Sequence, residues 1–258
     1  MKKKNYAIFI PARYHSTRFP GKPLVKILGE EMLLRVFNVC NKVLPKRVFV
    51  LSDSYKIYNF CDKNRIPYFK TSKKCKTGTD RIIEIKKKLN LDLYINVQGD
   101  EPLLEKNNLI LFIKKALKFN ESICMGRSKI STSSFFNKNI PKVVCDEYNN
   151  LLYISRAAIP SSKNKISSEK FGQVNLYSYP RKFLNAKLLN NKSKLEEIED
   201  IEIIRFLERG EKIKVIDLIS NNHPVDIPSD IRIVENILKK KNEKTFNNRF
   251  RKFKFKSY

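Results

Sequence analysis

The stretch Tyr6-Ala-Ile-Phe-Ile-Pro11 is a short apolar run, rich in β-forming residues, that leads directly into a loop of Arg, Ser, Thr, Pro and Gly residues. This pattern is typical of a buried parallel strand that ends in a functional loop. A second strand of this kind is predicted at Leu93–Val97, and the polar segment Gln98–Pro102 follows it. Because ligands bind at the carboxyl ends of parallel strands, we expect the two loops to face one pocket.

Strands and helices alternate along much of the chain, which predicts right-handed crossovers and a mainly parallel α/β sheet with helices on both faces. Apart from the two strands above, strands are predicted at Arg47–Leu51 and Lys212–Leu218. The predicted helices are Met32–Val43, Ser54–Asn64, Asp80–Leu89, Glu196–Glu208 and Ser229–Lys240.

The pattern changes between Lys142 and Tyr179, where short β-like runs surround the polar stretch Ser161–Lys170. We interpret residues 140–180 as an antiparallel insertion or a subunit-contact region. It lies within one predicted domain, residues 1–241, and residues 242–258 form a basic tail. The predicted strands of the insertion are Lys142–Cys145, Leu152–Ser155 and Gln173–Tyr179.

The composition narrows the classes of chemistry. No apolar run approaches the roughly 18 residues that a membrane helix needs, and we expect a cytoplasmic protein. Two histidines and five cysteines without a C-x-x-C pair disfavour a zinc site, a disulfide framework and a Ser-His-Asp hydrolase. Carboxylates and cations must therefore carry any chemistry.

The formal net charge of +27 has two interpretations. A basic surface can bind nucleic acid or an anionic membrane, whereas codon drift in an AT-rich genome would add lysines without function. The segment Lys239–Tyr258 carries nine Lys or Arg residues against one Glu, interleaved with aromatic residues. Such a segment can bind single-stranded nucleic acid, or it can be a frayed terminus. We prefer drift and a frayed terminus.

Three cations, Arg13, Arg18 and Lys22, crowd the loop after the first strand, and Pro20 and Gly21 shape its turn. They suit a triphosphate, although a solvated basic loop has the same composition. The seven glycines contain neither G-x-G-x-x-G nor G-x-x-x-x-G-K, so a dinucleotide or kinase-type loop is disfavoured.

Asp100 and Glu101 follow the second strand, where we expect their carboxylates at the ligand edge beside the basic loop. Carboxylates next to phosphate-binding cations suggest Mg²⁺, which takes one or two protein carboxylates and completes its shell with phosphate and water. Asp226 is the best second carboxylate. For each aspartate the alternative is a helix cap. Thr77-Gly-Thr-Asp-Arg81 is either a helix start or a segment that reads a base edge.

Five motifs in order carry a resemblance to a known family: Ile10-Pro-Ala-Arg-Tyr-His-Ser-Thr-Arg-Phe-Pro-Gly-Lys-Pro23, Thr77-Gly-Thr-Asp-Arg81, Tyr94-Ile-Asn-Val-Gln-Gly-Asp-Glu-Pro102, Ile154-Ser-Arg-Ala-Ala-Ile-Pro160 and Val225-Asp-Ile-Pro228. Together they resemble the 3-deoxy-manno-octulosonate (Kdo) cytidylyltransferases, or CMP-Kdo synthetases, of lipopolysaccharide synthesis. The resemblance runs from about Tyr6 to Leu238. It implies a Rossmann-like nucleotidyltransferase fold and a homodimer formed through the inserted β region.

The resemblance also implies roles for individual residues. The phosphates of CTP are expected at Arg13, Arg18 and Lys22, and Mg²⁺ at Asp100 and Asp226, so that Arg13, Arg18, Lys22 and Asp100 form the catalytic set. The nucleotide is expected at Thr77, Gly78, Asp80 and Gln98. The sugar acid is expected at Gln98, Arg156, Gln173, Tyr177 and Glu202.

The implied reaction is in-line attack of the anomeric C2 hydroxyl of Kdo on the α-phosphorus of CTP, which releases pyrophosphate. Gln173 stands where the family commonly has His, and Ile203 stands where a Gln is common. These departures leave a related acceptor open, either 8-amino-Kdo or a sialic-type acid. A remote alternative is an inactive relative that binds RNA or an anionic membrane.

Overall fold

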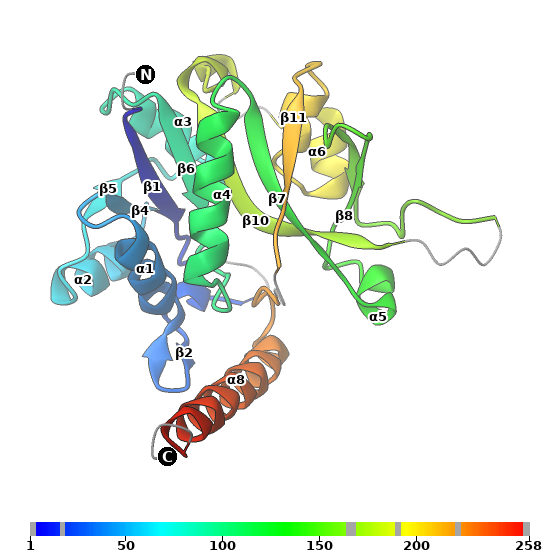
Figure 1. Ribbon diagram of the computed structural model, residues 1–258. Coiled ribbons are helices and arrows are strands. Elements are labelled where there is room, and N and C mark those ends of the chain that lie inside the picture. Colours follow the sequence, from blue (N-terminus) through cyan, green and yellow to red (C-terminus); the bar gives the residue numbers. More distant parts are fainter. Residues whose placement is uncertain (1–3, 16–18, 164–168, 189–191, 220–222, 255–258) are drawn as a thin grey trace.

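The structure is a computed structural model that describes residues 4–15, 19–163, 169–188, 192–219 and 223–254. Its main sheet has the strand order β11-β7-β10-β6-β1-β4-β5, and β8 and β9 join it through the pairing of β8 with β10 (Figure 1). A separate ribbon joins β2 and β3. The strands are β1 (Tyr6–Pro11), β2 (Lys26–Ile27), β3 (Glu30–Glu31), β4 (Val48–Ser52), β5 (Tyr68–Lys70), β6 (Leu93–Val97), β7 (Ile123–Lys129), β8 (Lys142–Cys145), β9 (Leu151–Ser155), β10 (Phe171–Pro180) and β11 (Ile213–Asp217).

The helices cover both faces of this sheet. The α-helices are α1 (Met32–Val43), α2 (Tyr55–Lys63), α3 (Gly78–Lys86), α4 (Lys106–Lys118), α5 (Thr132–Phe136), α6 (Lys194–Glu199), α7 (Ile204–Leu207) and α8 (Pro228–Lys254). Short 3₁₀ turns occur at η1 (Lys22–Leu24), η2 (Arg181–Phe183) and η3 (Ala186–Leu188).

Strand β1 contributes side chains to the hydrophobic core on both faces of the sheet. Successive side chains of a strand point to opposite sides, and all but the first residue of β1 are buried. Ile8 and Ile10 belong to a core cluster that includes residues of α1, α2 and α4. Ala7 and Phe9 belong to a second cluster with residues of α3 and α7. The continuous apolar run therefore marks a central strand, as predicted.

Of the seven strands in the main order, all but β10 run parallel to one another, while β8 and β9 pair antiparallel at the side of β10. Strands β6, β1, β4 and β5 pair in parallel, as do β7 and β11. Strand β10 is antiparallel to β6 and β7, between which it lies, and also to β8. The predicted fold class is confirmed, with one refinement: β10, predicted as part of an insertion, lies in the middle of the main sheet. Its buried Val174 and Leu176 supply the core residues that this position needs.

Several bounds agree with prediction, and others need correction. Tyr6–Pro11, Met32–Val43, Leu93–Val97 and Lys142–Cys145 are confirmed to the residue. The single helix predicted at Glu196–Glu208 is wrong: α6 ends at Glu199, because the left-handed backbone of Asp200 (φ 50°, ψ 48°) cannot continue a right-handed helix. The pattern did not lead us to predict α4 or β7.

Helix α8 leads away from the body of the molecule (Figure 1). Its residue Val234 is buried with Val225, Leu103 and Met32 in a third apolar cluster. The helix continues to Lys254, through most of the predicted tail, while residues 255–258 lie outside the described ranges. The division of the chain after residue 241 stays a prediction. Within the described ranges, no helix combines the length and apolarity that crossing a membrane would require.

Candidate active site

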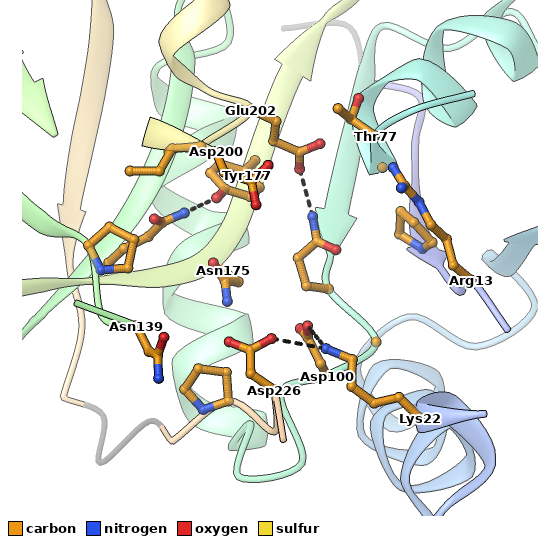
Figure 2. A pocket seen from close by; sticks show the side chains of 18 of the residues that line it. Arg13, Lys22, Thr77, Asp100, Asn139, Asn175, Tyr177, Asp200, Glu202 and Asp226 are labelled. Carbon is orange, nitrogen blue, oxygen red and sulfur yellow. Dashed lines mark hydrogen bonds and ion pairs between the residues drawn. The ribbon is translucent and has the colours of Figure 1, made fainter. Parts of the chain in front are cut away.

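A pocket of about 510 Å³ opens where β1 and β6 end. Two walls face each other across it (Figure 2). The first, which we call the parallel-strand wall, comprises Pro11–Arg13, Lys22, Thr77, Gly78, Gln98–Asp100 and Asp226. The second, which we call the β10 wall, comprises Ser128, Asn139–Pro141, Arg156, Gln173, Asn175, Tyr177, Glu196 and Asp200–Glu202.

Lys22 joins the two predicted metal carboxylates. Its Nζ donates to Asp100 Oδ2 at 2.8 Å and to Asp226 Oδ1 at 3.2 Å (Figure 2). Burial by itself lowers the pKa of Lys22, but the charges of Asp100 and Asp226 outweigh burial and raise this pKa above its ordinary value. Lys22 is therefore a cation at neutral pH. Gly21 precedes it with φ 73°, a left-handed turn that glycine adopts without strain.

Asp100 does not cap helix α4, so the capping alternative is not supported for this aspartate. Helix α4 has Glu105 at its N-cap and no side-chain cap bond. At the start of α8, Asp230 accepts hydrogen bonds from the backbone N–H groups of Asp226 and Ile227, at 2.8 and 3.0 Å. The backbone N–H of Val225 donates to the carbonyl of Asp100 at 3.1 Å, which holds the segment of Asp226 beside Asp100.

The two carboxylates fit a magnesium site. Oδ1 of Asp100 is buried and accepts no hydrogen bond from any described residue, so an oxygen ligand remains available there. The described residues contain no group of three or more His, Cys, Asp or Glu side chains that could hold a metal by themselves. A cation at Asp100 and Asp226 would need further oxygens, which the phosphates of a nucleotide supply in many Mg²⁺ sites.

The segment Thr77–Asp80 begins helix α3 with a capping box. Thr77 Oγ1 accepts from the backbone N–H of Asp80 at 3.1 Å, and Asp80 Oδ2 accepts from that of Thr77 at 2.9 Å. A Cβ on Gly78 would stand 3.0 Å from Pro11 Cγ and 3.1 Å from Gln98 Nε2, so glycine lets this turn approach β1 and β6 closely. Thr77 and Gly78 line the pocket.

Asp80 itself requires a correction. We predicted it as a nucleotide contact, but its side chain is fully buried and does not line the pocket. Oδ1 of Asp80 accepts from Arg205 Nη1 at 2.7 Å, and Oδ2 accepts the N–H groups of the capping turn. Asp80 therefore shapes the turn from behind.

Glu202 connects the two walls. Its Oε2 accepts from the backbone N–H of Thr79 at 2.9 Å, and its Oε1 accepts from Gln98 Nε2 at 2.6 Å. Gln98 belongs to the segment after β6, whereas Glu202 lies between α6 and α7. Both line the pocket, as predicted residues of a shared site.

Three residues of β10 line the other wall: Gln173, Asn175 and Tyr177. They are two residues apart, so they share one face of the strand. Gln173 Nε2 donates to the Tyr177 hydroxyl. Tyr177 is 2% exposed, and burial followed by the charge of Glu202 raises its pKa well above the ordinary value. Tyr177 is therefore a neutral phenol at physiological pH.

Arg156 is bound mainly to backbone carbonyls. Its guanidinium donates to Glu199 O at 2.6 Å, Lys138 O at 3.0 Å and Asp200 O at 3.1 Å. These bonds fix the end of α6 and the segment before β8, and they occupy three of its five N–H donors. Arg156 lines the pocket, where its remaining donors can serve a ligand.

Lys142 supports the same region from inside. It is fully buried, and its ammonium donates to the carbonyls of Asn137 at 3.0 Å, Ile140 at 2.7 Å and Arg156 at 2.5 Å. The ammonium thereby ties two segments of the β10 wall together. Nothing in the one-dimensional pattern distinguishes this lysine from the many on the surface.

Glu101 and Arg18 differ from the other predicted residues of the site. Glu101 was expected at the ligand edge, but it is 1% exposed, and burial together with the charge of Asp100 raises its pKa to about 8. Asp100 lines the pocket, whereas Glu101 does not. Arg18 lies outside the described residues. We did not predict Ser128, Asn139, Asn175 or Glu196; the alternation along β10 could have indicated Asn175.

Comparisons with known proteins agree with this geometry. A protein-family model described as cytidylyltransferase matches residues 7–213. The 3-deoxy-manno-octulosonate cytidylyltransferase of Psychromonas ingrahamii is 35% identical, and the alignment covers 82% of this chain and 89% of that one. The 8-amino-3,8-dideoxy-manno-octulosonate cytidylyltransferase of Shewanella pealeana is 34% identical, with 90% and 97% covered.

A solved structure gives the same result. The CMP:2-keto-3-deoxy-manno-octonic acid synthetase complexed with CTP superposes with a TM-score of 0.84 at 27% identity, over 92% of this chain and 99% of that chain. The resemblance noted from the motifs is thus confirmed. This chain is a nucleotidyltransferase, and it belongs to the family of 3-deoxy-manno-octulosonate cytidylyltransferases.

Proposed function

We propose that this enzyme transfers CMP from CTP to the anomeric C2 hydroxyl of Kdo, with Mg²⁺ as cofactor, and forms CMP-Kdo and pyrophosphate for lipopolysaccharide synthesis. The observation that carries the proposal is the arrangement of Lys22 between Asp100 and Asp226, at 2.8 and 3.2 Å, on the pocket wall that follows β1 and β6. It combines a charged ammonium with carboxylates suited to a hard cation, which is what a nucleoside triphosphate requires.

In this proposal the parallel-strand wall binds the nucleotide. Arg13 and Lys22, together with Arg18, hold the phosphates, while Thr77, Gly78 and Gln98 surround the nucleoside. Asp100 and Asp226 would hold Mg²⁺, which supplies charge stabilisation at the phosphate oxygens when bound. Lys22 offsets the charge that develops at the α-phosphate during in-line attack, and no covalent enzyme intermediate is needed.

The β10 wall binds the sugar acid. Arg156, Gln173, Tyr177 and Glu202, with Gln98, are the groups that would meet its hydroxyl and carboxylate groups. The neutral phenol of Tyr177 and the amides of Gln98 and Gln173 can both donate and accept hydrogen bonds, as sugar hydroxyls require. This wall holds the acceptor against the nucleotide so that the C2 hydroxyl approaches the α-phosphorus in line.

A second acceptor, 8-amino-Kdo, is supported by a specific finding. The Shewanella pealeana relative named for that sugar is about as similar to this chain as the relatives named for Kdo. Gln173 and Ile203 are the departures from the family pattern that leave the acceptor open. Of the two, Gln173 lines the pocket, whereas Ile203 is fully buried.

We also propose a cytoplasmic homodimer that forms through the β8–β9 region. All five cysteines are free thiols in the structure, as in proteins of a reducing compartment. Tyr148 and Leu152 of the β8–β9 hairpin are 71% and 57% exposed, so they offer apolar surface to a second copy of the chain. Sedimentation analysis would test the dimer, and Leu152→Lys should shift it toward the monomer.

The direct test is a pyrophosphate-release assay with CTP, Mg²⁺ and a panel of Kdo, 8-amino-Kdo and a sialic acid. We expect release with Kdo, abolished by EDTA and restored by Mg²⁺. If 8-amino-Kdo were turned over faster than Kdo, it would be the preferred acceptor, and the proposed cytidylyl transfer would stand. If no sugar acid supports release from CTP, the proposed function is wrong.

A further inference from the structure

Behind the pocket, Arg205 and Glu202 hold the same turn from one short segment. Glu202 accepts from the backbone N–H of Thr79 at 2.9 Å. Arg205, one helical turn later, donates to Thr77 Oγ1 at 3.1 Å and to Asp80 Oδ1 at 2.7 Å. The turn at Thr77–Asp80 is thus bound at its hydroxyl, at its backbone and at its carboxylate.

The guanidinium of Arg205 uses every donor it has. Nε and Nη2 bind the two carboxylate oxygens of Glu196, at 3.0 and 2.5 Å. Nη1 donates to Asp80 and, at 3.4 Å, to the carbonyl of Leu188, and Nη2 also reaches Thr77. A guanidinium has five N–H groups in a fixed plane, and all five have partners here. Few substitutions could reproduce that pattern.

This cluster is almost entirely buried. Arg205 and Glu196 are each 1% exposed, and Asp80 is 0% exposed. Burial by itself lowers the pKa of Arg205, but the hydrogen bond to Glu196 and the charge of Asp80 outweigh burial and raise this pKa above its ordinary value, so the guanidinium stays charged. Ordered charges of this kind hold their partners in one geometry because an unpaired buried charge is strongly unfavourable.

We infer that Arg205 is a positioning residue for the nucleotide: through Thr77 and Asp80 it sets the conformation of the Thr77–Gly78 turn, which lines the pocket. The inference rests on the proposed function, since it takes CTP as the ligand of that turn. Arg205 does not line the pocket itself. Arg205 reaches the pocket through Thr77 and Asp80 of the turn and through Glu196 of the β10 wall. Because two of these three partners belong to the turn, we expect CTP binding to change more than binding of the sugar acid.

Arg205→Lys is the first test variant, because it keeps the charge and removes the planar fork. Arg181→Lys is the matched control: Arg181 also binds groups on other elements, with Nη1 at 3.0 Å from the Leu89 carbonyl and 2.8 Å from the Tyr94 hydroxyl, but it lies outside the pocket lining. Both variants should lose thermal stability. Only Arg205→Lys should weaken CTP binding.

The measurement is the dissociation constant of CTP with Mg²⁺ by calorimetry, with the sugar acid omitted, alongside KM values for both substrates. For Arg205→Lys we expect a roughly tenfold weaker CTP affinity and a KM for the sugar acid within about threefold of wild type, in line with a loss of positioning rather than of a direct contact. Asp80→Asn provides a second route if Arg205→Lys does not fold, and it should weaken CTP binding similarly.

A double-mutant cycle then tests the path of the effect. Because Arg205 and Asp80 act through one contact, the double variant should lose less CTP affinity than the sum of the single losses. If wild type binds CTP and both single variants bind it equally well, the inference is overturned while the proposed function stands. If wild type does not bind CTP, the proposed function fails and the inference fails with it.

Discussion

The two walls of the pocket are built on different physical principles. The parallel-strand wall carries formal charges into the pocket, with Lys22, Asp100 and Asp226 in mutual contact. On the β10 wall, Gln173, Asn175 and Tyr177 present neutral polar groups. There the cations Lys142 and Arg156 bind backbone carbonyls. The charged residues Glu196 and Glu202 of this wall are likewise bound to protein groups. The parallel-strand wall thus places charges beside the ligand, whereas strand β10 offers neutral hydrogen-bonding groups.

This difference suits the two proposed substrates. A triphosphate needs fixed charges that do not have to reorganise during reaction. A sugar acid presents several hydroxyl groups, and a site that pairs each of them discriminates by leaving its own groups unpaired when one is missing. The comparison therefore predicts that substitutions on the two walls will change the kinetic constants of different substrates.

The largest effect is expected for Asp100→Asn, which removes a charge from the parallel-strand wall while keeping its shape. We expect kcat/KM to fall by about two orders of magnitude or more, as for other losses of a main charge-stabilising element. Pyrophosphate release measures it. Asp217→Asn is the control, since Asp217 pairs with Arg127 outside the pocket lining, and it should keep near wild-type activity.

A smaller effect, on the opposite wall, is expected for Lys142→Met, which keeps the length of the side chain and removes its three donors. The KM for the sugar acid should rise about tenfold and that for CTP should change little, because the loosened segments belong to the β10 wall. Steady-state kinetics with each substrate varied in turn would show this. An equal rise in both KM values would contradict the separation of the walls.

Glu202→Gln addresses the point where the walls meet. The variant keeps one acceptor oxygen but loses the charge that holds both Thr79 and Gln98. We expect both KM values to rise by about three- to fivefold, which corresponds to roughly 1 kcal/mol, the usual net value of a hydrogen bond. If only one KM changed, Glu202 would belong to a single wall.

The smallest predicted effect concerns pH and stability. Burial, followed by the charge of Arg156, lowers the pKa of Lys142 below its ordinary value of 10.5. The unfolded chain then binds more protons than the native protein in the alkaline range just below pH 10.5, so this lysine makes the free energy of unfolding rise with pH there. Urea unfolding at pH 7 and pH 10 should show wild type gaining stability relative to Lys142→Met. Parallel changes in the two proteins would contradict this.

The sequence predicted the parallel-strand wall far better than the β10 wall, and the reason is geometric. Arg13, Gln98 and Asp100 follow β1 and β6 within three residues, so a strand pattern alone places them at one edge, and Lys22 ends the loop after β1. Asn139 and Glu196 reach the pocket only through tertiary packing of segments far apart in the chain. Asp80, in contrast, was predicted at the site but does not line the pocket. Its place in a motif near the ligand does not reveal which way its side chain points.

The contact between Lys22 and Asp226 spans 204 residues of sequence. Consequently the site is complete only when the segment before α8 has docked beside Asp100, where the backbone N–H of Val225 binds the carbonyl of Asp100. Once β1 and β6 have emerged from the ribosome, the nascent chain already contains most of the parallel-strand wall. It still lacks the second carboxylate, Asp226. Catalytic competence would thus arise late in synthesis, once nearly the whole domain has folded.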